Sequence, residues 1–311
     1  MTAVTGQASS WRSWHLHTRS LDQRELARLV TEAVGPLIDQ LGAAGDDPAW
    51  FFVRYWQHGP HLRLRIRDRD HAAAAAIEAD LAARLARVSS GWPADADDAA
   101  YQQAVAPIAA AGEGGTAIDP GSLRAPGVYR EPYEPEYERY GGAKLMPVSE
   151  RVFHASSVVA LRVCRANGSG PLARGMQALT VSCAAIPQHP AAGDPADFLV
   201  TLRDRWTRWL AAGGHRIDPA AIDGEAGQAA RQLAVARPGL LAAARGDVPA
   251  RWSDWVAALR AATVAWQETL EPAQVRAIFG SHLHMMQNRL GVGFGREGYL
   301  AAILLHLLGD R

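Results

Sequence analysis

One segment near the N-terminus constrains the fold most strongly, because basic and aliphatic side chains alternate along it. Residues 61–67 read HLRLRIR, with one imidazole and three guanidinium groups at odd positions and three aliphatic groups at even positions. Successive side chains of a β-strand point to opposite faces of the sheet. The segment therefore predicts a strand with one face in the core and one basic face, which either meets water or forms an anion site.

The segments around this strand predict a small sheet with helices. Residues 11–19 alternate as a strand does, and the aromatic segment 49–57 can turn through His58 and Gly59 directly into the arginine strand. Apolar spacing predicts helices at 21–42 and 70–88, the second with Asp70 as its N-cap. We expect a mainly antiparallel sheet with helices packed on one face.

The rest of the chain changes in composition twice. Residues 112–148 are rich in Gly, Pro, Glu and Tyr, which predicts an irregular, site-forming segment with a short strand near 128–133. The sequence after Pro147 predicts helices near 149–166, 172–186, 194–212, 225–235, 248–271, 272–290 and 297–308. We therefore expect an α+β fold in one domain, 1–311, made of a sheet-and-helix region (11–111), the irregular segment (112–148) and a helical region (149–311).

Charge and hydropathy exclude some partners. Basic and acidic residues balance at 32 each, which does not favour direct binding to nucleic acid. The N-terminus lacks the apolar stretch of a signal peptide, and the run YLAAILLHLLG is too short to span a bilayer, so we expect a cytoplasmic protein without membrane contact. Because Lys144 is the only lysine, the position of each arginine is informative and the choice of arginine over lysine is not.

Three segments carry candidate chemistry, and the arginine strand is the first. Arg63 and Arg65 on its basic face can bind a carboxylate through bidentate guanidinium hydrogen bonds. The second segment, YEPEYERYGG at 133–142, places Glu136, Arg139 and Tyr140 together. Their pairing is either a weak surface ion pair or, next to the arginine strand, part of a charged pocket.

The third segment is FGSHLHMMQNRLG at 279–291. On a helix, Ser281, His284 and Asn288 share one polar stripe. A Ser-x-x-His pair can fix an imidazole by hydrogen bonding and make it an acid or base near neutral pH. A lone histidine is more often structural, so this segment needs the other two to indicate a site.

Two further patterns do not predict cofactors. GFGREG at 293–298 matches G-x-G-x-x-G, but it follows a helix and has no acidic ribose-binding residue after it. His15-x-His17 and His282-x-His284 have the spacing of metal ligands without a convincing third ligand. We expect neither a metal nor an organic cofactor.

Taken together and in order, FFVRYWQHGPHLRLRIR, YEPEYERYGGAKLMPVSERVF and SHLHMMQNRLG resemble the glutamate-elimination domain of class I lanthipeptide dehydratases. They also resemble its stand-alone relatives in thiopeptide and goadsporin-type biosynthesis. The resemblance covers the chain from Trp14 to Leu308. The individual motifs are short, and their combination and order make the resemblance specific.

The resemblance implies an activity and partners. In that family a glutamyl-tRNA-dependent enzyme esterifies Ser or Thr of a ribosomal precursor peptide, and the elimination domain expels glutamate to leave dehydroalanine or dehydrobutyrine. This chain has the length of the second part only. The resemblance therefore implies a split lyase that acts on a precursor peptide with a leader and depends on a separate glutamylating enzyme.

The resemblance also implies residue roles. Arg63 and Arg65 match the paired strand arginines, Glu136 and Arg139 the E-x-x-R motif, and His284 the helical histidine. We expect His284 to transfer the proton, and Arg63, Arg65 and Arg139 to bind the glutamyl group and stabilise developing charge. The expected substrate contacts are Glu136, Tyr140, Ser281 and Asn288.

One departure keeps two alternatives open. Relatives often carry Asp-Ser after the Glu-x-x-Phe of the following helix, where this chain has Ser156-Ser157. The first alternative is a thiopeptide pyridine synthase, which joins two dehydroalanines in a formal [4+2] cycloaddition and releases the leader peptide. The second is a non-catalytic module that binds the precursor peptide. The complete set of arginines, glutamate and histidine favours the eliminase, because only that enzyme must hold a glutamyl group.

Overall fold

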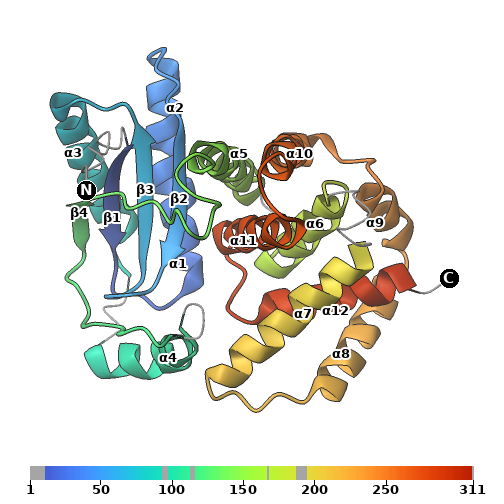
Figure 1. The fold of residues 1–311 in the computed structure, drawn as a ribbon. Coiled ribbons are helices and arrows are strands. Elements are labelled where there is room, and N and C mark those ends of the chain that lie inside the picture. The colour runs from blue at the N-terminus through green and yellow to red at the C-terminus, as the bar shows by residue number, and fades with distance from the viewer. Residues whose placement is uncertain (1–10, 93–96, 113–115, 167, 187–194, 310–311) are drawn as a thin grey trace, which may run out of the picture.

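The computed structural model describes residues 11–92, 97–112, 116–166, 168–186 and 195–309. Over these residues the protein is α+β, with a four-stranded antiparallel sheet beside a mostly helical remainder (Figure 1). The predicted fold class is therefore confirmed. Residues 113–115 of the predicted irregular segment lie outside the described residues. No helix in the described part of the chain is long and apolar enough to cross a membrane.

The sheet has the strand order β2-β3-β1-β4. Neighbouring strands are antiparallel throughout, and the short strand predicted near 128–133 is found as β4. The predicted hairpin joins β2 to β3 through His58 and Gly59, both at positive φ. The strands are β1 (Trp11–His17), β2 (Trp50–Tyr55), β3 (His61–Arg67) and β4 (Gly127–Glu131).

The two faces of β3 differ as the alternation predicts. Leu62, Leu64 and Ile66 are completely buried, and the register places Leu64 beside Trp14 of β1. The basic side chains occupy the opposite face, where Arg63 pairs with His15 of β1. This arrangement gives the sheet one aliphatic face and one basic face.

Helices α1 (Gln23–Arg28), α2 (Gly35–Ala43) and α3 (His71–Val88) accompany the sheet. Asp70 caps α3 by accepting a hydrogen bond from the backbone N–H of Ala73, as predicted. The single helix predicted over 21–42 is interrupted by a π-helical turn, η1 (Leu29–Val34). This turn ends at Val34, two residues before Pro36, and a proline has no N–H for an α-helical hydrogen bond.

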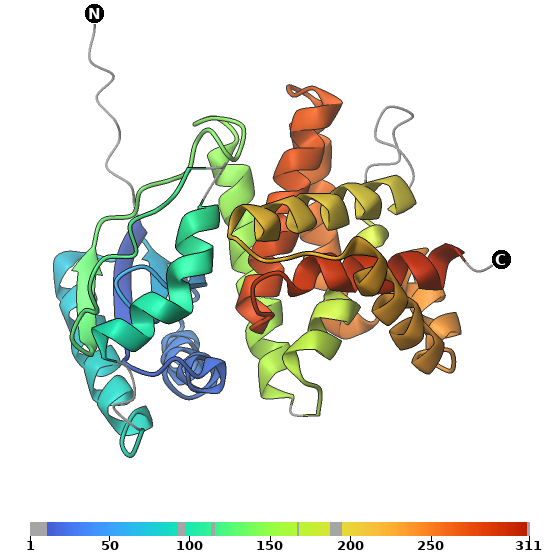
Figure 2. The same ribbon diagram turned by 90° about the horizontal axis from the view of Figure 1, so that it is seen from below.

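Helix α4 (Asp98–Ala111) was not predicted. Its apolar stripe is weak and Pro107 lies inside it, so periodicity gave no clear signal. Asp97 caps its start, and the hydroxyl of Tyr101 donates to backbone carbonyls of Trp56 and Pro120. The helix lies at one end of the strands and contacts α7, so it connects the sheet region with the helical region (Figures 1 and 2).

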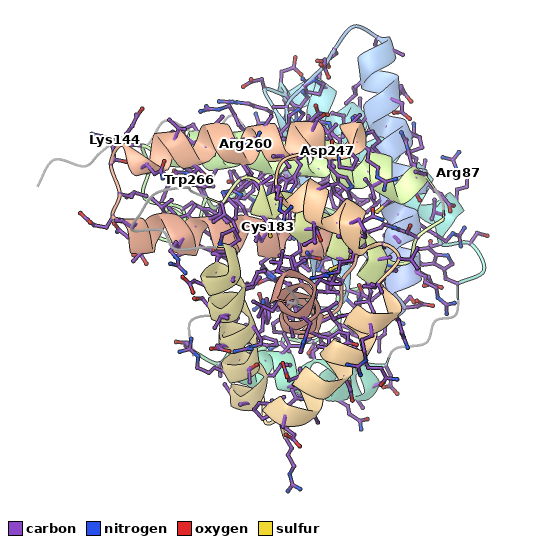
Figure 3. All side chains as sticks on the ribbon, turned by 90° about the vertical axis from the view of Figure 1, so that its right-hand side faces the viewer. Arg87, Lys144, Cys183, Asp247, Arg260 and Trp266 are labelled. Atoms are coloured by element: carbon purple, nitrogen blue, oxygen red, sulfur yellow. The ribbon has the colours of Figure 1, made fainter. Side chains whose placement is uncertain are left out.

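The helical region follows the predicted pattern with one addition. Helix α9 was not predicted, because its eight residues are short for a periodic signal. Trp266 and Cys183 are buried within this region, whereas the single lysine, Lys144, is exposed (Figure 3). The elements are α5 (Met146–Arg165), α6 (Pro171–Cys183), α7 (Pro195–Ala212), α8 (Pro219–Gln232), α9 (Arg237–Ala244), the 3-10 turn η2 (Ala250–Trp252), α10 (Ser253–Gln267), α11 (Pro272–Leu290) and α12 (Arg296–Gly309).

Strand β2 forms the seam between the two regions, because α5 and α11 contact it. Its outward backbone groups bond to side chains instead of a further strand. The N–H of Phe52 donates to Ser157 Oγ at 3.2 Å. The amide of Asn288 accepts from Arg54 N–H and donates to Arg54 C=O, both at 2.9 Å. The position of α11 relative to the basic face is therefore fixed by hydrogen bonds.

Candidate functional site

A cavity of about 1170 Å³ lies between the two regions. Its walls are the basic face of β2 and β3, the loop 135–139, α4, α7 and α11. Three sequence segments that were singled out separately therefore meet at one place. The predicted residues that line the cavity are Arg63, Arg65, Glu136, Arg139, Ser281, His284 and Asn288.

Arg63 is held in position by the ring of Tyr55 and by a neighbouring imidazole. Its guanidinium carbon lies 3.4 Å from the centroid of the Tyr55 ring, a cation–π contact. Its Nε donates to His61 Nε2 at 3.1 Å. The ring and the hydrogen bond leave the guanidinium at the cavity wall with restricted freedom.

Arg65 is a buried cation in the same wall. Its guanidinium carbon lies 5.2 Å from the centroid of Phe51 and 5.0 Å from that of Tyr133. Burial, followed by the charge of Arg63, lowers the pKa of Arg65 to about 10, so the group stays charged at neutral pH. Its buried Nε has no hydrogen-bond partner among the described residues. Because buried charges are normally paired, this group favours an anionic ligand.

Glu136 and Arg139 form the predicted ion pair, with Arg139 Nη1 2.9 Å from Glu136 Oε2. Arg139 Nε also donates to Ser281 Oγ at 3.3 Å. The loop that follows β4 in the chain is thereby attached to α11. The pair is part of the cavity wall and not an isolated surface salt bridge.

His284 is oriented by a residue that the sequence analysis did not identify. Its Nδ1 lies 2.7 Å from Oε1 of Glu297, which begins α12 and is almost completely buried. The prediction that Ser281 fixes this imidazole is wrong, because the hydroxyl of Ser281 bonds Arg139 instead. An ionised carboxylate has no hydrogen to donate, so the imidazole must carry its proton on Nδ1. The lone pair of the neutral imidazole is then on Nε2.

Two of the predicted substrate contacts interact with other parts of the protein instead. Asn288 reaches the cavity, but its amide oxygen and amide nitrogen both form hydrogen bonds with the backbone of Arg54. Tyr140 does not line the cavity: it is 1% exposed and packs against Phe153 and His282 at ring distances of 5.0 and 5.1 Å. We therefore do not propose that Tyr140 contacts substrate.

The Ser156-Ser157 departure also lies outside the cavity wall. Both residues are buried, and Ser157 Oγ accepts from Arg289 Nε at 2.9 Å as well as from Phe52 N–H. The two terminal nitrogens of Arg289 are buried without a hydrogen-bond partner among the described residues. The departure thus affects the seam between β2, α5 and α11, and the cavity keeps its charged groups.

Arg205 and Glu297 are the site residues that sequence reasoning missed. Arg205 lies in α7, a helix with no distinctive motif, and lines the cavity opposite the sheet. Glu297 belongs to the GFGREG segment, which was considered only for dinucleotide binding. No helical spacing connects Glu297 with His284, because α11 ends between them and Glu297 belongs to the next helix, α12.

His15, His17 and His61 form a cluster whose ligand atoms lie within 4.8 Å of one another. The expectation that the His15-x-His17 pair has no convincing third ligand is therefore wrong, because His61 lies beside it. Burial and Arg63 lower the pKa of His15 to about 3, and burial and Arg124 lower that of His17 to about 4. The rings of His17 and His61 stack at 4.1 Å, and the charges of Arg63 and Arg124 that lower these pKa values also repel a cation. We propose no metal here.

Comparisons with known proteins identify a family and related folds. The family described as "Lantibiotic biosynthesis dehydratase C-term" matches residues 11–308. No curated protein matches the sequence. Among solved structures, the pyridine synthase TbtD from thiomuracin biosynthesis superposes with a TM-score of 0.71 at 16% identity, covering 96% of this chain and 97% of that one.

Two further structures share the fold. TsrL has a TM-score of 0.66 at 17% identity and covers 96% of this chain and 94% of its own. The tRNA-dependent lantibiotic dehydratase MibB from Microbispora sp. 107891 has a TM-score of 0.56 at 22% identity. This chain aligns over 99% of its own length and spans 29% of MibB. The family match over nearly all described residues, together with the shared fold, shows that the chain belongs to the lantibiotic dehydratase C-terminal family.

Proposed function

We propose that the protein eliminates glutamate from glutamylated Ser or Thr residues of a ribosomally made precursor peptide. The observation that supports this best is the cavity itself, which combines guanidinium groups from the sheet with a carboxylate-oriented imidazole from α11. An eliminase needs one positioned base and several cations aimed at an anionic leaving group. The general role in modifying ribosomal peptides follows from the family.

The proposed reaction is a β-elimination. Nε2 of His284 takes the proton from Cα of the esterified residue, and the released electron pair forms the Cα=Cβ bond. The Cβ–O bond breaks, and glutamate leaves as a carboxylate with the two electrons of that bond. Glu297 stabilises the imidazolium that forms, because its carboxylate accepts from Nδ1–H. No organic cofactor takes part in these steps.

Arginines of the cavity wall stabilise the negative charge that develops on the substrate. Negative charge builds first on the carbonyl oxygen next to Cα and then on the departing carboxylate. Arg63 and Arg65 face the cavity from β3, and Arg139 is held there by Glu136 and Ser281. Fixed guanidinium groups stabilise such charge without reorganising during the reaction. Glu136, which is partly exposed, is suited to receive the ammonium group of the glutamyl moiety.

The mouth of the cavity is suited to a peptide. Tyr137 and Phe294 are 47% and 44% exposed, and both line the cavity. Phe294 stacks near Trp209 of α7 at a ring distance of 6.1 Å. Exposed aromatic side chains beside a polar site can hold the residues that flank the reacting Ser or Thr. The proposed partners are this precursor peptide and a separate enzyme that glutamylates it.

The alternative is a pyridine synthase, which would join two dehydroalanines in the same cavity. The likeness to TbtD over almost the full length of both chains favours it at the level of fold. A cycloaddition needs no group that binds glutamate. The buried, incompletely paired Arg65 and the His284–Glu297 pair therefore favour elimination.

The test offers the purified protein a precursor peptide already glutamylated on Ser or Thr and follows its mass. Loss of glutamate with formation of the dehydro residue is the expected result. Inertness toward this peptide, together with release of a macrocycle from a peptide that carries two dehydroalanines, would overturn the proposal in favour of the pyridine synthase. A peptide with free Ser or Thr serves as the substrate control, because hydroxide is a poor leaving group.

A further inference from the structure

Arg205 of α7 occupies the helical wall of the cavity. An ideal Cβ built on Gly280 of α11 would lie 3.6 Å from Arg205 Nη1, so the guanidinium rests over this glycine. Gly280 directly precedes Ser281, the hydroxyl that bonds Arg139. Arg205 is therefore placed beside the groups assigned to the reaction, on the side opposite the arginine strand.

Arg205 differs from Arg63 and Arg139 in its partners. Arg63 bonds His61, and Arg139 bonds Glu136 and Ser281. Arg205 makes no hydrogen bond or ion pair with another described residue, and its side chain remains open to solvent through the cavity. Partial desolvation by the cavity walls and then the charge of Arg139 lower the pKa of Arg205. Two neighbouring guanidinium groups are stabilised together when an anion binds between them.

The chemistry of the substrate requires a second anion site. An amino acid is carried on tRNA through its α-carboxyl group, so the transferred glutamyl group is esterified at that carboxyl. The α-carboxyl is the one that leaves during elimination. The side-chain carboxylate stays charged throughout and distinguishes a glutamyl ester from uncharged acyl esters. A site that selects glutamate must place a cation at this carboxylate.

We propose that Arg205 binds the side-chain carboxylate of the glutamyl group and makes the enzyme selective for glutamyl esters. This inference rests on the proposed elimination and assigns its specificity. The guanidinium can donate two parallel hydrogen bonds to the carboxylate, which a neutral amide cannot accept in the same way. Arg63 and Arg65 then remain available to the reacting end of the substrate.

A positioning role is the competing explanation. The charge of Glu297 partly offsets the lowering of the Arg205 pKa, so a competing role for Arg205 is to stabilise the carboxylate that orients His284. Loss of such a role would slow every ester by the same factor. Loss of carboxylate recognition would slow the glutamyl ester alone.

The experiment compares two peptides esterified on the same Ser, one with glutamate and one with glutamine. Elimination is measured as kcat and KM for the wild type, Arg205→Gln, Arg205→Lys and Arg203→Gln. Arg203 is the control, because it lies in the same helix, pairs with Asp204 and does not line the cavity. We expect Arg205→Gln to lower kcat/KM for the glutamyl peptide by about 10- to 100-fold, mainly through KM, with little change for the glutaminyl peptide.

The other variants make the result decisive. Arg205→Lys keeps the charge and is expected to retain part of the preference for the glutamyl peptide, which also serves if Arg205→Gln does not fold. Arg203→Gln is expected to behave as the wild type. An equal loss on both peptides would overturn the inference and leave the proposed elimination standing. A wild type that eliminates neither group would overturn the proposed function instead.

Discussion

At the scale of single residues, the described part of the protein contains two histidine–carboxylate pairs with different surroundings. His284 bonds the buried Glu297 at the cavity wall, at 2.7 Å. His306 bonds Asp223 at 3.1 Å where α12 meets α8, and neither residue lines the cavity. Both pairs join the last helix to another element, but only the first can reach a bound substrate. The second pair is therefore a matched control for the first.

The first prediction concerns this pair. His284→Ala is expected to lower kcat of glutamate elimination by about 10²- to 10⁴-fold, because the reaction loses its base. Glu297→Gln is expected to lower kcat less, by about tenfold or more, because the amide can hold the ring but cannot stabilise the imidazolium. Steady-state assays on the glutamylated peptide measure both effects.

Asp223→Asn provides the comparison and is expected to keep wild-type kcat. Full activity in His284→Ala would show that another group removes the proton. A loss of kcat in Asp223→Asn equal to that in Glu297→Gln would show that both pairs act only by holding α12 in place.

The second prediction concerns pH and stability. His17 is 1% exposed, and burial followed by Arg124 lowers its pKa from 6.5 to about 4. Between these values the unfolded chain binds a proton and the native chain does not, so the free energy of unfolding falls as pH falls from 6.5 toward 4. This shift corresponds to roughly 3 kcal/mol for His17 alone.

His17→Gln is expected to make the free energy of unfolding fall less steeply over this pH range. Urea unfolding at several pH values between 7 and 4 measures the slope, and the exposed His215→Gln is the control. An unchanged slope in His17→Gln would contradict the prediction.

Residue types, spacing and the family resemblance predicted seven of the residues that line the cavity, but not how they are connected. Arg63, Arg65 and His284 were predicted because charge alternation and helical spacing are visible locally. Glu297 and Arg205 were missed because their contacts depend on how α7, α11 and α12 pack. Tyr140 was misplaced for the same reason: its neighbour Arg139 faces the cavity while Tyr140 faces the core.

At the scale of elements, the seam along β2 determines where α11 lies. A strand at the edge of a sheet usually leaves its outward N–H and C=O groups to solvent or to another strand. Here the side chains of Ser157 and Asn288 take those positions. Asn288 lies one helical turn after His284, so the hydrogen bonds that hold the strand also hold the imidazole.

The third prediction tests this seam. Asn288→Ala leaves the N–H and C=O of Arg54 without partners and is expected to lower the free energy of unfolding by about 1 to 3 kcal/mol. Asn288→Asp keeps an acceptor for the N–H and loses the donor to the C=O, so a smaller effect is expected. Chemical denaturation measures both changes.

Elimination assays on the same variants separate packing from function. We expect kcat to fall in Asn288→Ala even under conditions where the variant is fully folded, because α11 shifts relative to the arginines. Unchanged stability in Asn288→Ala would show that solvent satisfies the backbone of Arg54.

Element types were predictable where the periodicity is strong, and their junctions were not. Residues 272–290 were predicted as a helix and form α11 with the same bounds. The proline-containing α4 and the short α9 lack a distinct apolar pattern, so the sequence did not indicate them. The apolar spacing of residues 21–42 indicates a helix but does not distinguish the π-helical turn η1 from an α-helix. The side-chain hydrogen bonds along β2 join residues more than 100 positions apart and leave no local pattern.

At the scale of the whole molecule, the sheet region depends on the helical region. Phe51 of β2 packs against Phe153 of α5 at a ring distance of 5.2 Å, and Trp50 packs near His154. Aromatic contacts therefore join the sheet to the helices beside the hydrogen bonds of the seam. The organisation of residues 1–311 as one domain stays a prediction, and these contacts favour it.

The fourth prediction tests that organisation. A fragment of residues 1–145, which ends before α5, is expected not to fold by itself, because the edge of β2 and its aromatic side chains lose their partners. Near-ultraviolet circular dichroism and limited proteolysis compare the fragment with the full chain. A fragment that unfolds cooperatively and resists proteolysis would show that the sheet region is an independent domain.

The bidentate contact between Asn288 and the backbone of Arg54 has a consequence for catalysis. It sets the separation between imidazole and guanidinium groups during folding, before any peptide arrives. In the proposed elimination, the entropy lost in bringing the protein's own imidazole and guanidinium groups together would be lost during folding and not during the reaction. In the proposed elimination, this fixed separation would favour side chains that fit between the imidazole and the guanidinium groups, without the need for a closing lid.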